Sequence, residues 1–285
     1  MLGQERFSQY NALFSRILVE KKHLIAVHRG SWGGNLIQNT VPAYIAAVKM
    51  GADMVESDVN RSTDGEFFSF HDGNEPNLWG IEKSVKKMSA KEIDAVRPLN
   101  TTKTPSRFSP SRLSEVLDFL PDNILLNIDR AWDIFPSLLP YLDNFEKAKT
   151  HVLLKAPPRE KAAYEALSNH PVKYPFMAIC NTIKEIEESL SYPDINLVGI
   201  ETNAKDENDP MFADSLISDL HRRNLFVWVN AIVVDDQHPL YAGLDDDISV
   251  ICDPALGWGK LMDKHIDILQ TDWPALLYQY RATRI

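Results

Sequence analysis

Eight short apolar segments, mostly separated by helix-like segments, predict an α/β fold of the (β/α)8 or TIM barrel class for this chain. Alternation of strand, helix and strand implies parallel pairing, and eight such units close a barrel. With 285 residues, 44% of them hydrophobic, the chain can bury one large core. Because no linker-like stretch divides the sequence, we expect one barrel domain over residues 1–285.

The predicted strands are short runs of apolar and β-branched residues bounded by polar segments. They cover residues 24–28, 54–59, 124–129, 151–156, 176–180, 197–202, 225–231 and 267–272. The predicted helices between them cover residues 42–50, 111–120, 158–168, 183–190, 209–223 and 254–263. Thr40 is the expected N-cap of the first of these helices, and Gly51 is its expected end.

The region after the second strand departs from this repeat. Residues 67–71 form a further strand-like segment after the Asp64-Gly65 turn, so we expect a short hairpin that carries His71 over the barrel mouth. Residues 73–110 have weak periodicity and contain four prolines. Because long loops inside a compact domain usually carry function or move, we expect an insertion over about residues 66–110 that shapes substrate access.

Composition restricts the partners and the compartment. The formal charge of −10, without a basic stripe, argues against nucleic acid as a partner. Cys180 and Cys252 lie in or beside apolar runs, so we expect two buried thiols. No segment is long enough to predict a membrane span, and the first twenty residues lack the apolar core of a signal peptide. We expect a cytoplasmic location for the chain as given, and a secreted or periplasmic one if a leader was removed; a homo-oligomer stays open.

Polar residues stand near the carboxyl ends of the predicted strands, where (β/α)8 barrels build their active sites. They are His28, Glu56, Asp58, Asp129, Lys155, Glu201, Asn230 and Asp272. Glu56 and Asp58 are two residues apart on one strand, so their side chains share a face. Two carboxylates that close repel each other unless a cation lies between them, which favours a hard divalent metal with oxygen ligands.

Two imidazoles beside such a metal, His28 and His71, indicate acid-base chemistry on a metal-held anion. A single polar residue at a strand end often only caps the next turn. We interpret Asp272, which precedes Trp273-Pro274, as a helix N-cap, whereas Glu201 and Asn230 fit structure and function equally. The two histidines and the acidic pair together favour function, because four independent coincidences on one rim would otherwise be required.

Several motifs resemble the opening signature of the glycerophosphodiester phosphodiesterases. They are His28-Arg29-Gly30, Gln38-Asn39-Thr40 with Ala43, residues 51–58, residues 63–65 and His71-Asp72. The likeness continues at residues 112–117 and ends at residues 267–274, so it covers nearly the whole chain. It implies a (β/α)8 barrel with a hairpin-bearing insertion after the second strand.

The resemblance also implies roles for single residues. Glu56, Asp58 and Asp129 would hold one divalent cation, either Mg²⁺ or Ca²⁺. His28 and His71 would be the acid-base pair, and Arg29 would bind the phosphate of a small-molecule diester. The implied activity is that of a phosphoric diester hydrolase in lipid and glycerol metabolism. It would cleave a glycerophosphodiester to an alcohol and glycerol phosphate through a cyclic phosphate.

Three positions depart from the family pattern: Gln38 and Asp129 each stand where a glutamate is more common, and Ala131 stands where a lysine is usual. We therefore expect Lys155, one strand further round, to be the second cation near the phosphate. Tryptophans could line the mouth at positions 32, 132 and 228; Trp228 and Asn230 are expected substrate contacts, and choline is not predicted.

Three alternatives stay open. A lipid phosphodiesterase of the phospholipase or sphingomyelinase D type would expose an apolar rim near the insertion, where residues 77–81 form a short candidate patch. A non-catalytic barrel that binds phosphate esters is supported only by Gln38 and Ala131. A metal-free phosphatidylinositol lyase is disfavoured, because Glu56 and Asp58 would repel the substrate phosphate without a metal.

Overall fold

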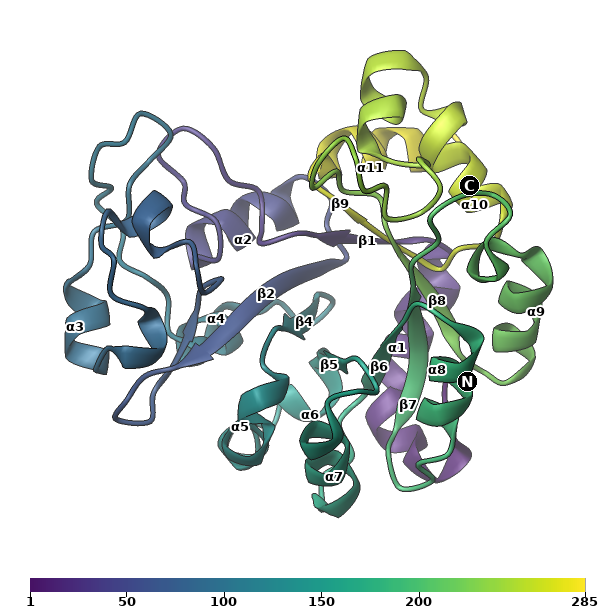
Figure 1. Cartoon of the computed structure of the whole chain (residues 1–285), viewed down its shortest axis with the longest axis horizontal. Helices are drawn as coiled ribbons and strands as arrows, with labels where there is room; N and C mark the ends of the chain where they lie inside the picture. Colours follow the sequence, from purple (N-terminus) through teal and green to yellow (C-terminus); the bar gives the residue numbers. More distant parts are fainter. Residues whose placement is uncertain (285) are drawn as a thin grey trace.

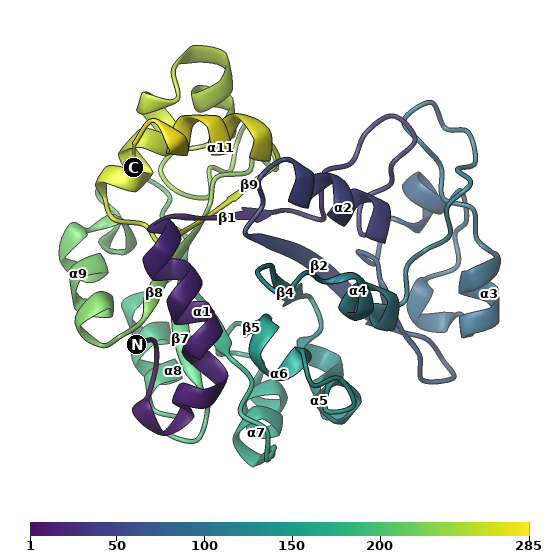
Figure 2. The same cartoon turned by 180° about the vertical axis from the view of Figure 1, so that it is seen from behind.

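The computed structural model describes residues 1–284, which form a closed barrel of eight parallel strands surrounded by helices (Figures 1 and 2). The barrel strands are β1 (Leu24–Val27), β2 (Met54–Arg61), β4 (Leu125–Asp129), β5 (Val152–Ala156), β6 (Phe176–Cys180), β7 (Leu197–Thr202), β8 (Phe226–Asn230) and β9 (Ile268–Thr271). The barrel closes because β1 pairs in parallel with both β2 and β9. The predicted fold class is confirmed, and the predicted strand ends differ from these by two residues at most.

The helices are α1 (Ser8–Lys21), α2 (Val41–Lys49), α3 (Ala90–Ala95), α4 (Leu113–Phe119), α5 (Phe135–Leu142), α6 (Ala148–His151), α7 (Lys161–Asn169), α8 (Ile183–Leu190), α9 (Asp214–Arg222), α10 (Lys260–Asp263) and α11 (Pro274–Ala282). Two predicted helices are each divided into an α-helix and a short helical segment of another type, a 3₁₀-helix in the first and a π-helix in the second. These are Pro210–Phe212 with α9, and Ala255–Gly259 with α10.

Helix α1, which the sequence pattern did not predict, packs against the barrel interior and crosses in front of the strands in Figure 2. Phe14 and Ile17 of α1 belong to the same buried cluster as the inward-facing strand residues, and Phe14 stacks on Phe226 with ring centroids 5.1 Å apart. Phe226 has room inside the barrel because Gly199 faces it; a Cβ at Gly199 would lie 2.2 Å from the Phe226 ring. These contacts close the barrel interior with apolar side chains.

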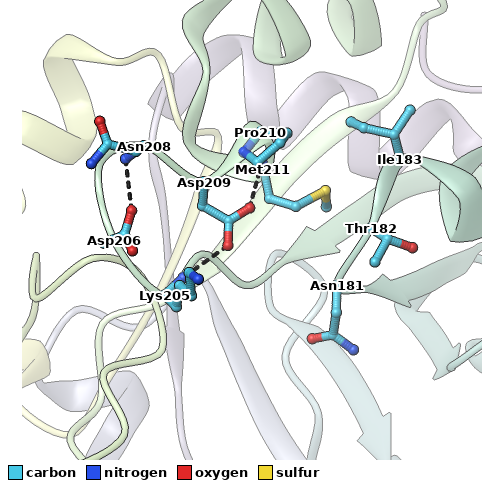
Figure 3. A pocket seen from close by; sticks show the side chains of 9 residues that line it. All are labelled: Asn181, Thr182, Ile183, Lys205, Asp206, Asn208, Asp209, Pro210 and Met211. Atoms are coloured by element: carbon cyan, nitrogen blue, oxygen red, sulfur yellow. Dashed lines mark hydrogen bonds between the residues drawn. The ribbon is translucent and has the colours of Figure 1, made fainter.

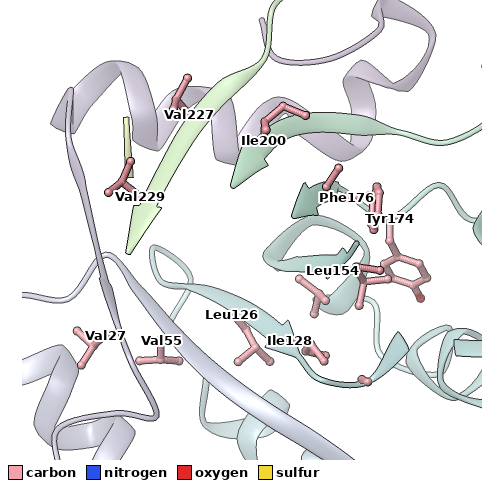
Figure 4. Packing of buried hydrophobic residues seen from close by; sticks show 14 of the residues in the cluster. Val27, Val55, Leu126, Ile128, Leu154, Tyr174, Phe176, Ile200, Val227 and Val229 are labelled. Atoms are coloured by element: carbon pink, nitrogen blue, oxygen red, sulfur yellow. The ribbon is translucent and has the colours of Figure 1, made fainter. Parts of the chain in front are cut away.

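Side chains of the barrel strands alternate between two apolar layers, as the two-residue period of a strand requires. The outer layer packs between sheet and helices and includes Val27, Val55, Leu126, Leu154, Phe176, Ile200 and Val227 (Figure 4). The inner layer includes Leu24, Ala26, Met54, Leu125, Leu153, Met177, Val198, Phe226 and Ile268. On β2, β4 and β5, the inward positions after this inner layer are polar. A polar surface therefore lies at the carboxyl ends of the strands.

The insertion begins with β3 (Phe67–Ser69), which pairs antiparallel with β2, so the predicted hairpin is confirmed. A small apolar cluster of its own fills the segment that follows and includes Phe68, Phe70, Trp79, Val85, Met88, Ala90 and Ile93. In Figure 1 this segment, with α3, lies to one side of the barrel, beyond β2. It extends the wall of the barrel mouth on the β2 side.

One local prediction holds in position only, and another is wrong. Thr40 occupies the N-cap position of α2, but its hydroxyl donates to the Ile37 carbonyl and caps nothing; the Val41 N–H donates instead to the Ser111 hydroxyl, at 3.0 Å. Cys180 is buried as expected, whereas Cys252 is exposed, because it ends a short surface turn. Among residues 1–284, no helix combines the length and the apolar character that crossing a membrane would require.

Candidate active site

Three carboxylates meet at the carboxyl ends of two neighbouring strands. Glu56 and Asp58 come from β2 and Asp129 from β4, and the register places Asp58 opposite Asp129. One oxygen of each carboxylate lies within 4.8 Å of the others. Burial, together with repulsion from Asp58 and Asp129, raises the pKa of Glu56 well above its ordinary value. Glu56 Oε1 is buried and has no hydrogen-bond partner among the described residues. This donor set fits a divalent cation, which would neutralise the carboxylates and fill the vacant acceptor.

Asn39 fixes the orientation of Asp58. Its amide nitrogen donates to Asp58 Oδ2 at 2.9 Å, and its amide oxygen accepts the Asp58 backbone N–H at 3.1 Å. Asn39 adopts a left-handed backbone conformation, with φ at 57°, and also accepts a hydrogen bond from the Tyr44 hydroxyl. The Gln38-Asn39-Thr40 motif thus acts on the carboxylate cluster through its asparagine.

Arg29 lies against the same carboxylates. Its backbone N–H donates to Glu56 Oε2 at 2.9 Å, and its Nε lies 3.0 Å from Asp58 Oδ2. One terminal guanidinium nitrogen donates to Gln38 Oε1 at 2.9 Å. A glutamate at position 38 would compete for the Arg29 charge, whereas the neutral amide leaves more of that charge to attract an anion.

His28, at the end of β1, is paired with Asp272 at the end of β9. Its Nδ1 lies 3.1 Å from Asp272 Oδ1. The N-cap interpretation of Asp272 is wrong: Trp273 occupies the N-cap position of α11, and no side chain caps that helix. The missed signal is topological, because closing a barrel places the last strand beside the first. Asp272 therefore belongs to the candidate site.

Asp246 holds the strand end that carries Asp272, the partner of His28. The sequence pattern did not predict this role. Its carboxylate accepts hydrogen bonds from the Thr271 hydroxyl, the Trp258 indole N–H and the Asp272 backbone N–H, each at 2.8 Å. Burial raises the pKa of Asp246 to about 7 despite these three donors. The carboxylate thus ties the loop after β8 to the strand end that holds Asp272.

His71 reaches the rim from the hairpin arm. The Phe70 N–H donates to the Asp58 carbonyl at 2.9 Å, so His71 follows directly after a contact with β2. His71 Nδ1 lies 2.8 Å from the Asp72 carbonyl oxygen and 3.1 Å from the Asn74 amide nitrogen. The shorter contact is with an oxygen that can only accept, so it favours a proton on Nδ1, which leaves Nε2 as the acceptor.

On the opposite rim, polar side chains form a continuous hydrogen-bonded chain. Lys155 Nζ lies 2.8 Å from Asp129 Oδ2 and 3.0 Å from Glu201 Oε2. Glu201 accepts from the Asn230 amide at 2.8 Å, and the Trp228 indole donates to Asn230 Oδ1 at 2.8 Å. Burial alone would lower the pKa of Lys155, but attraction by the carboxylates of Asp129 and Glu201 outweighs it and raises the pKa. Lys155 is therefore a permanent cation next to the three-carboxylate cluster.

The three tryptophans expected at the mouth differ in position. Trp32 is half exposed, in the loop after β1, whereas Trp132 packs partly buried against the outer core. Trp228 is fully buried inside the barrel, with Lys155 Nζ 5.5 Å from its ring centroid. Only Trp32 offers a substantially exposed ring.

Two cavities flank this rim. One, of about 450 Å³, lies between the loops after β6 and β7, and Thr182, Lys205 and Asp209 are among its lining residues (Figure 3). Its polar groups are largely engaged with the chain: Thr182 caps α8, and Asp209 accepts the Met211 and Lys205 N–H groups. The other cavity, of about 510 Å³, lies beside Asp272 and is mostly apolar.

Comparison with known sequences yields a family model and two curated relatives. The model DUF4996, described as a domain of unknown function, matches residues 176–281. "Glycerophosphodiester phosphodiesterase GDPD6" of Arabidopsis thaliana is 35% identical over 75 residues, which are 26% of this chain and 20% of that protein. A glycerophosphodiester phosphodiesterase of Caldanaerobacter subterraneus is 31% identical over 112 residues, 38% of this chain and 45% of that protein. The matches thus span less than half the length of either relative.

Solved structures of the same family share the fold. A glycerophosphoryl diester phosphodiesterase of Parabacteroides distasonis superposes with a TM-score of 0.73 at 15% identity, covering 95% of this chain and 92% of that one. A phosphodiesterase of Oleispira antarctica, solved with its product sn-glycerol-3-phosphate, gives a TM-score of 0.65 at 16% identity and covers 93% and 99% of the two chains. This chain is thus a sequence relative of the glycerophosphodiester phosphodiesterases and has the fold of that family.

Proposed function

We propose that this chain is a metal-dependent phosphoric diester hydrolase that cleaves a glycerophosphodiester to an alcohol and glycerol phosphate. The observation that carries the proposal is the buried Glu56 Oε1, which has no hydrogen-bond partner among the described residues and lies in a cluster of three acids. Arg29 and His28 lie on the same rim, and His71 enters it from the hairpin. The curated relatives and the product held by the Oleispira antarctica neighbour support the same reaction class.

Glu56, Asp58 and Asp129 would hold one divalent cation, Mg²⁺ or Ca²⁺, since carboxylate oxygens suit both. When bound, such a cation neutralises phosphate charge and orients the attacking hydroxyl. Arg29 would bind two phosphate oxygens through its planar guanidinium, and Lys155 would add a second positive charge. Asn230, held by the Trp228 indole, would contact the substrate at the opposite rim.

The two histidines have surroundings that suit opposite roles. The free Nε2 of His71 would remove the proton from the glycerol hydroxyl, whose oxygen attacks phosphorus to form a cyclic phosphate. The phosphorus–oxygen bond to the alcohol then breaks. His28, whose Nδ1 faces the Asp272 carboxylate, would protonate the departing oxygen. Water would open the cyclic phosphate, with His28 now taking its proton and His71 returning one to the glycerol oxygen.

The test is turnover of a panel of glycerophosphodiesters by EDTA-treated protein to which Mg²⁺, Ca²⁺ or Mn²⁺ is restored. We expect metal-restored release of alcohol and glycerol phosphate, and its loss in His71→Ala. His238→Ala is the matched control, because His238 lies exposed in the loop after β8. Metal and diester binding without turnover would instead favour the non-catalytic alternative.

A further inference from the structure

A second feature of the mouth is the apolar cavity beside His28. It measures about 510 Å³ and lies between the loop after β1, helix α2 and the beginning of α11. Its apolar walls include Trp32, Leu36, Met50, Trp273 and Leu276. This volume lies within the range of about 300–1,000 Å³ that is common for small-molecule sites.

Four of these wall side chains are unusually exposed for their type. The exposed fractions are 50% for Trp32, 43% for Met50, 48% for Trp273 and 40% for Leu276. Single exposed apolar residues are ordinary, but a cluster that lines one cavity indicates a binding surface. Covering these side chains with an apolar ligand would remove them from water.

The apolar rim is not where the sequence suggested it. In the insertion, Trp79 is buried, and Leu78 and Ile81 pack against the insertion's own core. The exposed rim lies on the β1 and β9 side of the barrel instead, beside the candidate acid-base residue His28. An exposed apolar rim, the feature that would favour a lipid-like substrate, is therefore present, but beside β1 and β9 and not in the insertion.

Asp272 joins this cavity to the reaction centre. Its side chain belongs to the cavity wall, and its carboxylate lies 3.1 Å from His28 Nδ1. A group in the cavity thus lies one side chain away from the residue proposed to protonate the leaving oxygen. The same carboxylate disfavours an anionic ligand at the inner end of the cavity, and the apolar walls favour an uncharged chain over a hydrated cation.

We propose that the cavity binds the alkyl or acyl chain of the leaving alcohol, so that glycerophosphodiesters of chain-bearing alcohols are the preferred substrates. The proposal rests on the proposed function, because it places the leaving group next to His28. Trp32 and Trp273 would supply flat apolar contact area, and Met50 and Leu276 the remainder of the wall.

The kinetic test compares glycerophosphoethanolamine with its N-acyl derivatives of increasing chain length, each below its aggregation concentration. We expect kcat/KM to rise by up to about fourfold for each added methylene until the cavity is full. Trp32→Ala and Trp273→Ala should lower kcat/KM for the longest derivative at least tenfold more than for glycerophosphoethanolamine. Ile251→Ala, which removes an exposed apolar side chain elsewhere, should leave the chain-length series unchanged.

A binding measurement separates this proposal from the proposed function. Calorimetric titration of the N-acyl series into His71→Ala should give affinities that rise with chain length and that weaken on adding Trp32→Ala. Such affinities without turnover by the wild-type chain would overturn the proposed function and keep the cavity assignment. Turnover of glycerophosphoethanolamine with neither kinetic nor binding dependence on chain length would overturn the assignment alone. If sedimentation shows a dimer that Trp32→Ala dissociates, and chain length has no effect, the surface is an interface between copies.

Discussion

The two halves of the barrel rim differ in whether their buried charged groups have partners. On the β5, β7 and β8 side, Lys155, Glu201 and Asn230 satisfy one another in a continuous chain. On the β2 side, Glu56 and Asp58 share a buried space with Asp129, and one Glu56 oxygen has no partner among residues 1–284. Burying an unpaired charge costs far more than burying a paired one. The uncompensated half therefore marks where a ligand is required, and the compensated half is the rigid wall against which it binds.

The largest effect should come from removing the unpartnered carboxylate with Glu56→Gln. We expect turnover to fall at least about 1,000-fold, as loss of a metal ligand removes transition-state stabilisation. In EDTA the same variant should be more stable than the wild type by about 1–3 kcal/mol, because a repulsive buried charge is gone. Urea unfolding with and without Mg²⁺ measures this contrast. A destabilised metal-free variant would show that Glu56 is structurally compensated after all.

The matching change on the other half, Lys155→Met, should act in the opposite sense. It leaves Asp129 and Glu201 without their cation, and breaking such a buried pair typically costs about 3–5 kcal/mol. Urea unfolding in EDTA measures the loss of stability. The double variant Lys155→Met with Glu201→Gln should recover part of it, because one of the two stranded charges is removed. If Lys155→Met were as stable as the wild type, Lys155 would not compensate these carboxylates, and the two halves of the rim would not differ.

Asp246 lies between the two halves and should give a pH signature. Its pKa is about 7 in the folded chain, against an ordinary value of 3.8, so the folded state holds the extra proton between these values. Its stabilising contribution is complete below about pH 4 and is lost as pH rises through about 7. The free energy of unfolding of the wild type minus that of Asp246→Asn should fall by up to about 4 kcal/mol over this window. Urea titrations at several pH values test it, with exposed Asp236→Asn as the control. A pH-independent difference would contradict the assignment.

Much of the barrel and the acidic cluster could be predicted from the sequence because their signals are local. Short runs of apolar and β-branched residues identified the strands, and Glu56 and Asp58 share a strand face whatever surrounds them. Helix α1 escaped prediction because its apolar residues do not keep to one face: Phe14 and Ile17 are buried, whereas Val19 is exposed. Its burial depends on the inward-facing side chains of the barrel strands, which are distant in the sequence.

The remaining parts of the site depend on contacts between distant segments. Asp246 acts on Thr271 and Asp272 across a loop whose course no periodic pattern specifies. Asp272 was misinterpreted because the Asp-Trp-Pro sequence fits a helix start equally well, and only barrel closure brings β9 beside β1. The apolar rim was sought in the insertion, where the sequence shows a compact patch, although α2 and the beginning of α11 form it together with the loop after β1.

The smallest predicted effect concerns how the rim holds His28. Asp272→Asn keeps a hydrogen-bond acceptor near Nδ1 but removes the negative charge that faces the His28 ring. We expect kcat/KM to drop about tenfold, because the imidazole loses the charged partner beside which it would exchange protons with the substrate. Steady-state kinetics on the best diester of the panel measures this effect. Glu201→Gln on the compensated half is the matched amide exchange and should lower kcat/KM less, because Asp129 still neutralises Lys155. If both variants lowered kcat/KM equally, the charge of the whole rim, and not the single Asp272 contact, would act on His28.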